Sequence, residues 1–332
     1  MDSTSHRGEA ATTRDADPFT NRWAIPYIDA PPSFWESLDS DLGPFISEVY
    51  FPLPSAVIGS GRPQQPERYR REFLTRAPVR KAALVNVVTL PRPAEELAPA
   101  IVEELRRLRD DHGIVGATVA DLSLARRIRD ALPSFSLTAS VLMDIAEPFQ
   151  AKALEGVCDT LVPASRIVRD LPALRELRAA FPGTIRLLVN EACLAGCPYR
   201  IQHFHEMASG VDRPKSLCAE LLSTQPWMRL TGGWVLPQYL HFYEGVYDEL
   251  KLAGRVTLAN EARYREVFSA FVQRRPLRPD SIGGGPSSVV EPIEMDDALF
   301  EYTLTCGRRC HTCTRCPDYY ERAIAQLVHD SL

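Results

Sequence analysis

The chain alternates between short apolar runs and longer amphipathic stretches over most of its length. Apolar runs typical of buried strands lie at residues 48–53, 82–90, 113–120, 136–143, 159–163, 185–190, 234–236 and 250–252. Between them, apolar positions recur at helical spacing, most clearly over 94–111 and also over 122–132, 149–157, 171–181, 199–209 and 260–275.

Apolar strands separated by helices predict a parallel sheet that is covered on both faces. About eight such units in roughly 250 residues predict an α/β fold of the TIM-like (β/α)8 barrel type. The alternative is an open doubly wound sheet. Gly59 and Gly61 follow the first predicted strand but lack the third glycine of a dinucleotide-binding turn, which weakens that alternative.

The composition along the chain predicts four segments. Residues 1–22 are polar and of mixed charge, so we expect a disordered tail, followed by the barrel over 23–275. Residues 276–290 are rich in Pro and Gly, which predicts a linker. Residues 291–332 form a cysteine-rich C-terminal extension with a helix over 318–328.

Charge and hydropathy limit the location and the partners. No run of about 18 apolar residues is present and the first residues lack the apolar core of a signal peptide, so we expect a cytoplasmic protein without a membrane segment. The net charge of -5 argues against general nucleic-acid binding.

The eight cysteines favour metal or redox chemistry over disulfides, because the cytosol keeps thiols reduced. Four of them, Cys306, Cys310, Cys313 and Cys316, lie within eleven residues and precede Pro317. This close spacing favours an iron–sulfur cluster, whose thiolate ligands must converge. Zinc is the main alternative, although zinc sites usually pair two C-x2-C knuckles across a longer spacer. The first three also match the radical-SAM triplet, which in that superfamily follows the first strand instead.

A second cysteine set follows the predicted strand 185–190. It consists of Cys193, Cys197 and, further along, Cys218. The carboxyl ends of barrel strands face the active site, so we expect metal ligands there. Cys158 lies at a helix–strand junction, and we expect it in the core. With seven cysteines left, the sequence allows two clusters, in which either one iron stays open or Cys158 or a histidine supplies the missing ligand. The alternative is one cluster that shares thiols from both sets.

Three segments resemble the peptidase U32 (collagenase-like) superfamily, in a branch with an NEGCLxxCPxR pattern. They are NEACLAGCPYR at 190–200, GWVLP at 233–237 and ELKLAGR at 249–255. The resemblance implies a TIM-like barrel with a cysteine-bound [4Fe-4S] cluster. It also implies oxygen-independent hydroxylation of ubiquinone precursors or RNA bases, with prephenate as a proposed oxygen donor. The compact C-x3-C and the cysteine-rich extension depart from the longer members.

Polar residues beside Cys193 are further site candidates. Glu191 is predicted to shuttle a proton or to bind substrate, with a salt bridge as the alternative. Asn190 and Arg200 are predicted to bind the cofactor. His203 follows Arg200 by one helical turn, so both can share a face, and we predict a catalytic role for it.

Lys251 and Arg255 flank the last predicted strand and are predicted to bind an anionic substrate, since such cations suit carboxylates. Ion pairs with Glu249 or Asp248 are the alternative. We also expect the extension to fold back over the mouth of the barrel and to bring its cysteines near the first set.

The cysteine patterns predict an iron–sulfur enzyme. The resemblance implies an oxidoreductase that carries out oxygen-independent hydroxylation or related redox chemistry on a small anionic molecule, with an electron donor or a partner subunit. The alternatives are an iron–sulfur RNA-modification subunit and a non-catalytic electron-transfer or scaffold protein. A true peptidase is not expected, because neither HExxH nor GxSxG occurs in the sequence.

Overall fold

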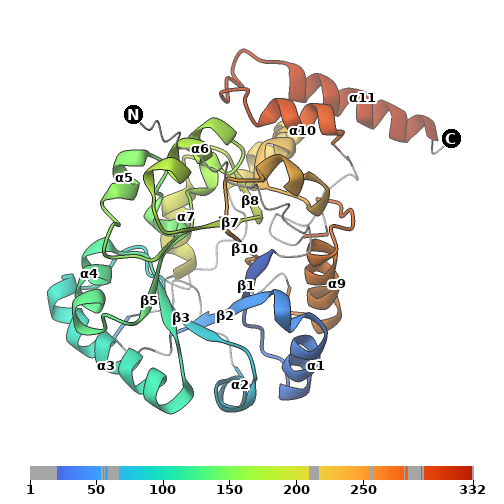
Figure 1. Cartoon of the computed structure of the whole chain (residues 1–332). Helices are drawn as coiled ribbons and strands as arrows, with labels where there is room; N and C mark the ends of the chain where they lie inside the picture. Colours follow the sequence, from blue (N-terminus) through green and yellow to red (C-terminus); the bar gives the residue numbers. More distant parts are fainter. Residues whose placement is uncertain are drawn as a thin grey trace, which may run out of the picture.

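The computed structural model describes residues 21–53, 55, 57–58, 67–208, 217–254, 258–279, 281–282, 293 and 295–330. Eight parallel strands close into a barrel surrounded by helices (Figure 1), which confirms the predicted TIM-like (β/α)8 fold. In order around the barrel they are β1 (Arg22–Pro26), β2 (Ile46–Pro52), β3 (Lys81–Val85), β4 (Gly116–Val119), β5 (Ser136–Ala139), β6 (Thr160–Leu161), β7 (Thr184–Leu188) and β10 (Glu249–Lys251).

Two details of the strand prediction are wrong. β1 was not expected, yet it pairs with β2 on one side and with β10 on the other and so closes the barrel. The run at 234–236 was expected to be a barrel strand. Instead β9 (Gly232–Trp234) pairs antiparallel with β8 (Asn190–Leu194), and this β8–β9 ribbon lies outside the barrel.

The helices cover the outer face of the strands. They are α1 (Pro32–Leu42), α2 (Arg70–Arg76), α3 (Ala94–His112), α4 (Leu122–Ala131), α5 (Pro148–Lys152), α6 (Leu171–Ala180), α7 (Arg200–Ala208), α8 (Leu217–Thr224), α9 (Glu261–Val272), α10 (Asp297–Thr303) and α11 (Arg315–Asp330). Side chains alternate along each strand, so one set points outward into this layer. Trp23 of β1, for example, packs with its ring centroid 5.9 Å from that of Phe268 in α9. Within the described residues, no helix is both long and apolar enough to cross a bilayer.

The opposite face of the strands fills the barrel with polar as well as apolar groups. Arg186 on β7 lies 2.6 Å from Glu48 on β2 and 2.7 Å from Glu249 on β10. All three are largely buried. Next along β10, the Lys251 Nζ atom lies 4.2 Å from the ring centroid of Tyr50. The barrel is therefore held together in its interior by charge pairing as well as by packing.

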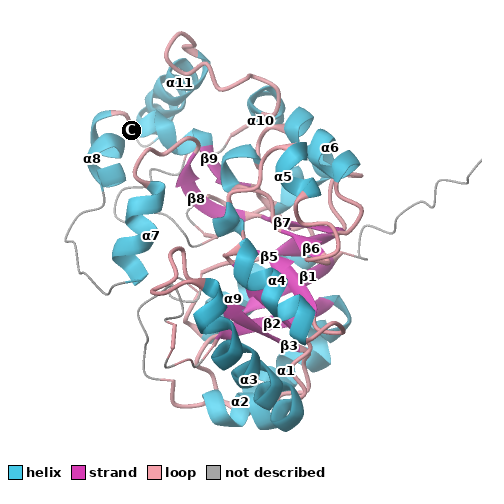
Figure 2. Cartoon of the chain, turned by 90° about the vertical axis from the view of Figure 1, so that its left-hand side faces the viewer, coloured by secondary structure: helices cyan, strands magenta, loops and turns pink. Residues whose placement is uncertain are grey.

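The C-terminal extension packs at the carboxyl end of the barrel strands. Figure 2 shows the β8–β9 ribbon above the barrel strands, with α10 and α11 beyond it. The Leu171 N–H, at the start of the helix after β6, donates to the Leu304 carbonyl at 2.9 Å. The Tyr239 and Phe300 rings stack with centroids 3.9 Å apart. The extension thus lies at the end of the barrel where active sites collect, as expected.

Candidate metal centre

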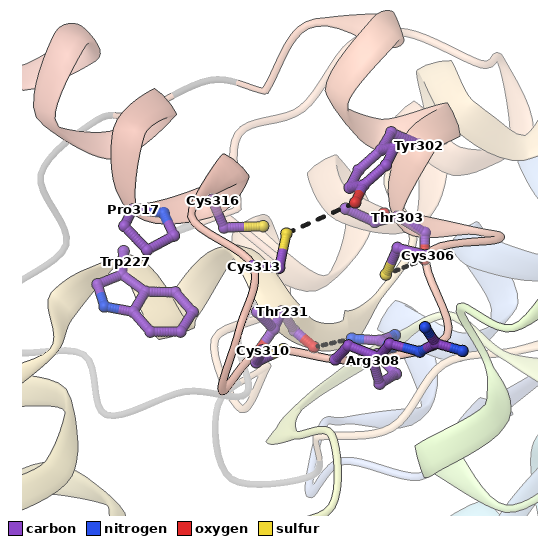
Figure 3. A pocket seen from close by; sticks show the side chains of 11 residues that line it. Trp227, Thr231, Tyr302, Thr303, Cys306, Arg308, Cys310, Cys313, Cys316 and Pro317 are labelled. Atoms are coloured by element: carbon purple, nitrogen blue, oxygen red, sulfur yellow. Dashed lines mark hydrogen bonds between the residues drawn. The ribbon is translucent and has the colours of Figure 1, made fainter.

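All four cysteines of the extension lie around one pocket. Cys306, Cys310, Cys313 and Cys316 come from the loop between α10 and α11 and the first turn of α11. Trp227, Thr231, Tyr302, Thr303, Arg308, Arg309 and Pro317 complete the lining. Figure 3 shows the sulfur atoms of Cys306, Cys313 and Cys316 directed toward the space between them. The lining does not include the other predicted ligands, Cys193, Cys197 and Cys218. We call it the tail pocket.

A tight turn gives the cysteine loop its shape. Gly307 and Arg308 have φ values of 65° and 55°, so two successive residues adopt the left-handed conformation. That conformation costs a non-glycine residue about 1–2 kcal/mol. Arg308 offsets this cost by donating from Nη1 to the Thr231 carbonyl at 2.9 Å. The same bond fastens the loop to the segment that leads into β9.

The tail thiols have unequal electrostatic environments. The Tyr302 hydroxyl lies 3.5 Å from the Cys313 sulfur and, as donor to it, lowers the pKa of that thiol. Burial raises the pKa of Cys316 to about 11, and partial burial of the otherwise exposed Cys310 raises the pKa of that thiol as well. Of these three thiols, Cys313 is therefore the one that ionises most readily, and Cys310 and Cys316 need a metal or a cation to stabilise their thiolates.

The described residues contain no group of three His, Cys, Asp or Glu side chains that meet as they would around one metal ion. A cubane cluster makes a different demand, because each of its irons takes one thiolate. Four thiols around a shared pocket match that donor set in number and in chemistry.

Arg169 connects the tail pocket to the barrel. It follows β6, is only 1% exposed, and donates to the Leu230 carbonyl at 2.6 Å and to Thr303 Oγ1 at 2.6 Å. Its guanidinium also lies between the rings of Trp234 and Phe300, 4.7 and 4.8 Å from their centroids. Burial lowers its pKa to about 10, and the positive charge of Arg308 adds to that effect. The sequence analysis missed this residue, because nothing local distinguishes it from a surface arginine.

The other cysteine set lies at the end of β7. Cys193 is on β8, and Cys197 follows in the turn before α7. Burial raises the pKa of the Cys193 thiol, and its hydrogen bond with Glu191 adds to the effect. Arg200 acts in the opposite direction. Glu191 therefore contacts the cysteine beside which it was expected, which places a carboxylate and a thiol together at the carboxyl end of the strands.

Arg200 has spare hydrogen-bonding capacity. Its side chain is 12% exposed, and its Nη1 atom lies 3.9 Å from Asp144, which follows β5. Nη2 is buried and has no hydrogen-bond partner among the described residues. A buried guanidinium of this kind can bind an anionic group.

The remaining predicted site residues are spread over the same end of the molecule. Asn190 is buried and accepts from the Ala253 N–H at 2.6 Å, so it connects the ends of β7 and β10. His203 lies half-buried on α7, and Cys218 lies half-buried at the start of α8. Lys251 faces Tyr50 inside the barrel. Arg255 lies outside the described residues.

Cys158 is a core residue, as expected. It is 6% exposed, and burial raises its pKa to about 12. It precedes β6 and therefore lies at the amino end of the strands, opposite Cys193. It cannot supply a fourth thiolate to the set at the active-site end.

The fold and the site define a TIM-like barrel that carries a cysteine-rich pocket at the carboxyl end of its strands. No protein-family model matches the chain. An uncharacterized protease of Methanocaldococcus jannaschii, MJ1657, is 26% identical over 179 residues, which is 48% of this chain and 52% of that protein. The match thus spans about half the length of that relative. The structure of the U32 peptidase Mk0906 has the same fold, with a TM-score of 0.51 and 14% identity, and the match covers 74% of this chain and 97% of that one. These matches are in line with the predicted resemblance to the peptidase U32 superfamily, and the match to Mk0906 shows the shared fold.

Proposed function

We propose that the chain is an iron–sulfur enzyme of the U32 type that carries out redox chemistry on a small anionic molecule, with oxygen-independent hydroxylation as the reaction class. The observation that carries this proposal is the tail pocket, in which four thiols surround one space at the active-site end of the barrel. A [4Fe-4S] cluster bound there would supply one-electron transfer. Cys306, Cys310, Cys313 and Cys316 would hold it.

The set beside β7 has a complementary role in this proposal. Cys158 is at the other end of the barrel, so at most Cys193, Cys197 and Cys218 remain for a cluster at this site. Three thiolates would leave one iron open to a small ligand. Glu191, hydrogen-bonded to Cys193, would accept or return a proton there.

Cations near the same end suit an anionic substrate or an oxygen donor such as prephenate. Arg200 Nη2 has no partner in the described part of the chain, and a guanidinium can bind a carboxylate through two hydrogen bonds. Lys251 adds a positive charge inside the barrel. These residues would bind and orient the molecule, while the extension limits the access of water from its side.

A non-catalytic electron-transfer protein is the second candidate. Cys310 is exposed and four thiolates would fill every iron of the tail cluster, so that cluster could exchange electrons with a partner without binding substrate. Peptidase activity has no support in the sequence motifs, and the word protease belongs to the name of the relative.

The deciding experiment is anaerobic purification followed by iron and sulfide counts and EPR spectroscopy. About four irons per chain would indicate one cubane and about eight would indicate two. Cys313→Ser should remove the iron of the tail pocket, and Cys193→Ala should remove iron at the other set together with activity. The control, Cys158→Ala, should keep the iron of the wild type. Stoichiometric zinc without iron, even after reconstitution, would contradict the proposal.

A further inference from the structure

Two arginines with no acidic partner among the described residues lie side by side at the tail pocket. Arg308 lines the pocket, and its Nη2 atom donates to the backbone carbonyl of Arg169 at 3.5 Å. Arg169 itself is completely enclosed. The two positive charges are close enough for Arg308 to disfavour the charged form of Arg169.

Within the described part of the chain, the hydrogen-bond acceptors of Arg169 are all uncharged. They are the carbonyls of Leu230 and Gly232, the Thr303 hydroxyl and, at 3.6 Å, the Met295 sulfur. Its Nε atom is buried and has no partner among the described residues. The acceptors satisfy its donors in part but do not balance its charge.

The charge of Arg308 is likewise not balanced by the acceptors that the described residues provide. Arg308 donates to the carbonyls of Thr231 and Arg169, and its Nε atom is likewise buried without a partner in the described part of the chain. No described carboxylate lies within ion-pair distance of either arginine. Arg186, by contrast, is paired with two carboxylates in the barrel interior.

Buried cations without counter-ions are costly, so an anion is expected near them. The groups near Arg169 that can become anionic are the Tyr243 hydroxyl and two thiols. Burial raises the pKa of Tyr243, so that hydroxyl stays neutral. Cys306 and Cys316 both interact electrostatically with Arg169, in the direction that favours its charged form. Among these described groups, the thiols of the tail pocket are therefore the ones that can supply negative charge to match the two arginines.

Resting on the proposed function, we propose that Arg169 and Arg308 balance the charge of an anionic thiolate–iron cluster in the tail pocket and favour its reduced state. Four thiolates give a cubane cluster a net negative charge, and reduction adds one more electron. Two cations at short range, one of them shielded from water, stabilise the reduced form more than the oxidised form. Arg169 and Arg308 are positioning residues and not ligands, because they would act on the cluster through electrostatic attraction.

Arg308 is the better residue to change. Arg169 fills the space between Trp234 and Phe300, so its removal would also disturb packing. Arg308 is only half-buried and makes two hydrogen bonds to backbone. Its exposed neighbour Arg309 lines the same pocket and offers a matched control for the loss of one positive charge.

The experiment compares the wild type with Arg308→Gln, Arg308→Lys and Arg309→Gln, all purified anaerobically. The readouts are iron content, the rate of iron loss to a chelator, and the midpoint potential from a redox titration followed by EPR. Arg308→Gln should shift the midpoint potential to a more negative value and lose iron about tenfold faster, as expected for one unit of charge at partial burial. Arg308→Lys should stay close to the wild type, and Arg309→Gln should match it because water screens an exposed charge.

Each of three outcomes would refute the inference. If Arg308→Gln and Arg309→Gln have the same potential and the same iron retention, charge balance by Arg308 is refuted while the iron–sulfur function stands. If Arg308→Lys fails as Arg308→Gln does, Arg308 acts through hydrogen-bond geometry and the charge argument is refuted. A wild-type protein that never holds iron would overturn the proposed function, and this inference with it.

Discussion

Replacing Asn190 separates a structural role from the cofactor-binding role predicted from the sequence. The Asn190 side chain donates to the carbonyls of Ala253 and Ile282 at 2.8 and 3.2 Å and accepts from the Ala253 N–H at 2.6 Å. All of its polar atoms are thus used by the protein. We expect Asn190→Ala to destabilise the fold without lowering iron content.

The size of the effect follows from these three bonds. Asn190→Ala leaves one buried N–H and two carbonyls without their partner, at a net cost of about 1 kcal/mol each. The free energy of unfolding should therefore fall by about 3 kcal/mol. Asn260 gives a reference on the same scale. Its side chain caps α9 through a single bond from the Arg263 N–H at 3.0 Å, and Asn260→Ala should cost about 1 kcal/mol.

The assay is equilibrium unfolding in urea, followed by circular dichroism, with iron counted in the same preparations. Asn190→Asp adds a pH test. The new carboxylate would face two carbonyl oxygens, so its pKa in the folded state should exceed the unfolded value of about 3.9. The folded state then binds the proton more tightly, and the stability of Asn190→Asp relative to wild type should fall as pH rises above about 4. An Asn190→Ala variant that keeps its stability but loses iron would refute the structural role.

Four further predictions follow from the barrel interior and the tail pocket. Arg186→Met should lower the free energy of unfolding by about 3–5 kcal/mol, because Glu48 and Glu249 lose their shared cation, and urea titration measures this loss. Adding Glu48→Gln and Glu249→Gln to that variant should recover part of the stability; no recovery would argue against charge as the cause. Lys251→Ala should keep the iron of the wild type and weaken the binding of a small dicarboxylate in calorimetry, and unchanged affinity would remove Lys251 from the site. Removal of metal by a chelator should raise the fluorescence of Trp227, which lines the tail pocket, and the signal change should vanish in a Trp227→Phe variant.

The barrel was predictable because apolar strands between amphipathic helices leave few other arrangements. β1 was missed because its apolar run is very short and lies between Arg22 and Pro26. Its identity as a strand depends on partners on both sides, and those partners are distant in sequence. Gly232–Trp234 was placed in the wrong sheet for a related reason, since an apolar triplet does not show which strand it will pair with.

Candidate ligands were easier to predict than their surroundings. Close spacing in sequence keeps Cys306–Cys316 close in space, whatever the rest of the chain does. Arg169 had no such signal, because its burial arises from Leu230 and Thr303, which the fold brings together from distant positions. The roles of Asn190 and Lys251 likewise depend on contacts between strands that sequence spacing does not reveal.

The position of β1 has a consequence for folding during synthesis. β1 is made first among the barrel strands, but one of its edges pairs with β10, which is made last. Until Glu249–Lys251 has left the ribosome, that edge of β1 and the far edge of β7 stay unpaired, and open edges invite association with other chains. The segment between β7 and β10 contains Cys193, Cys197 and Cys218, so the chain must produce these three cysteines before it can close the barrel. Nascent chains of this protein should therefore depend on protection of an open sheet until synthesis of the last strand is complete.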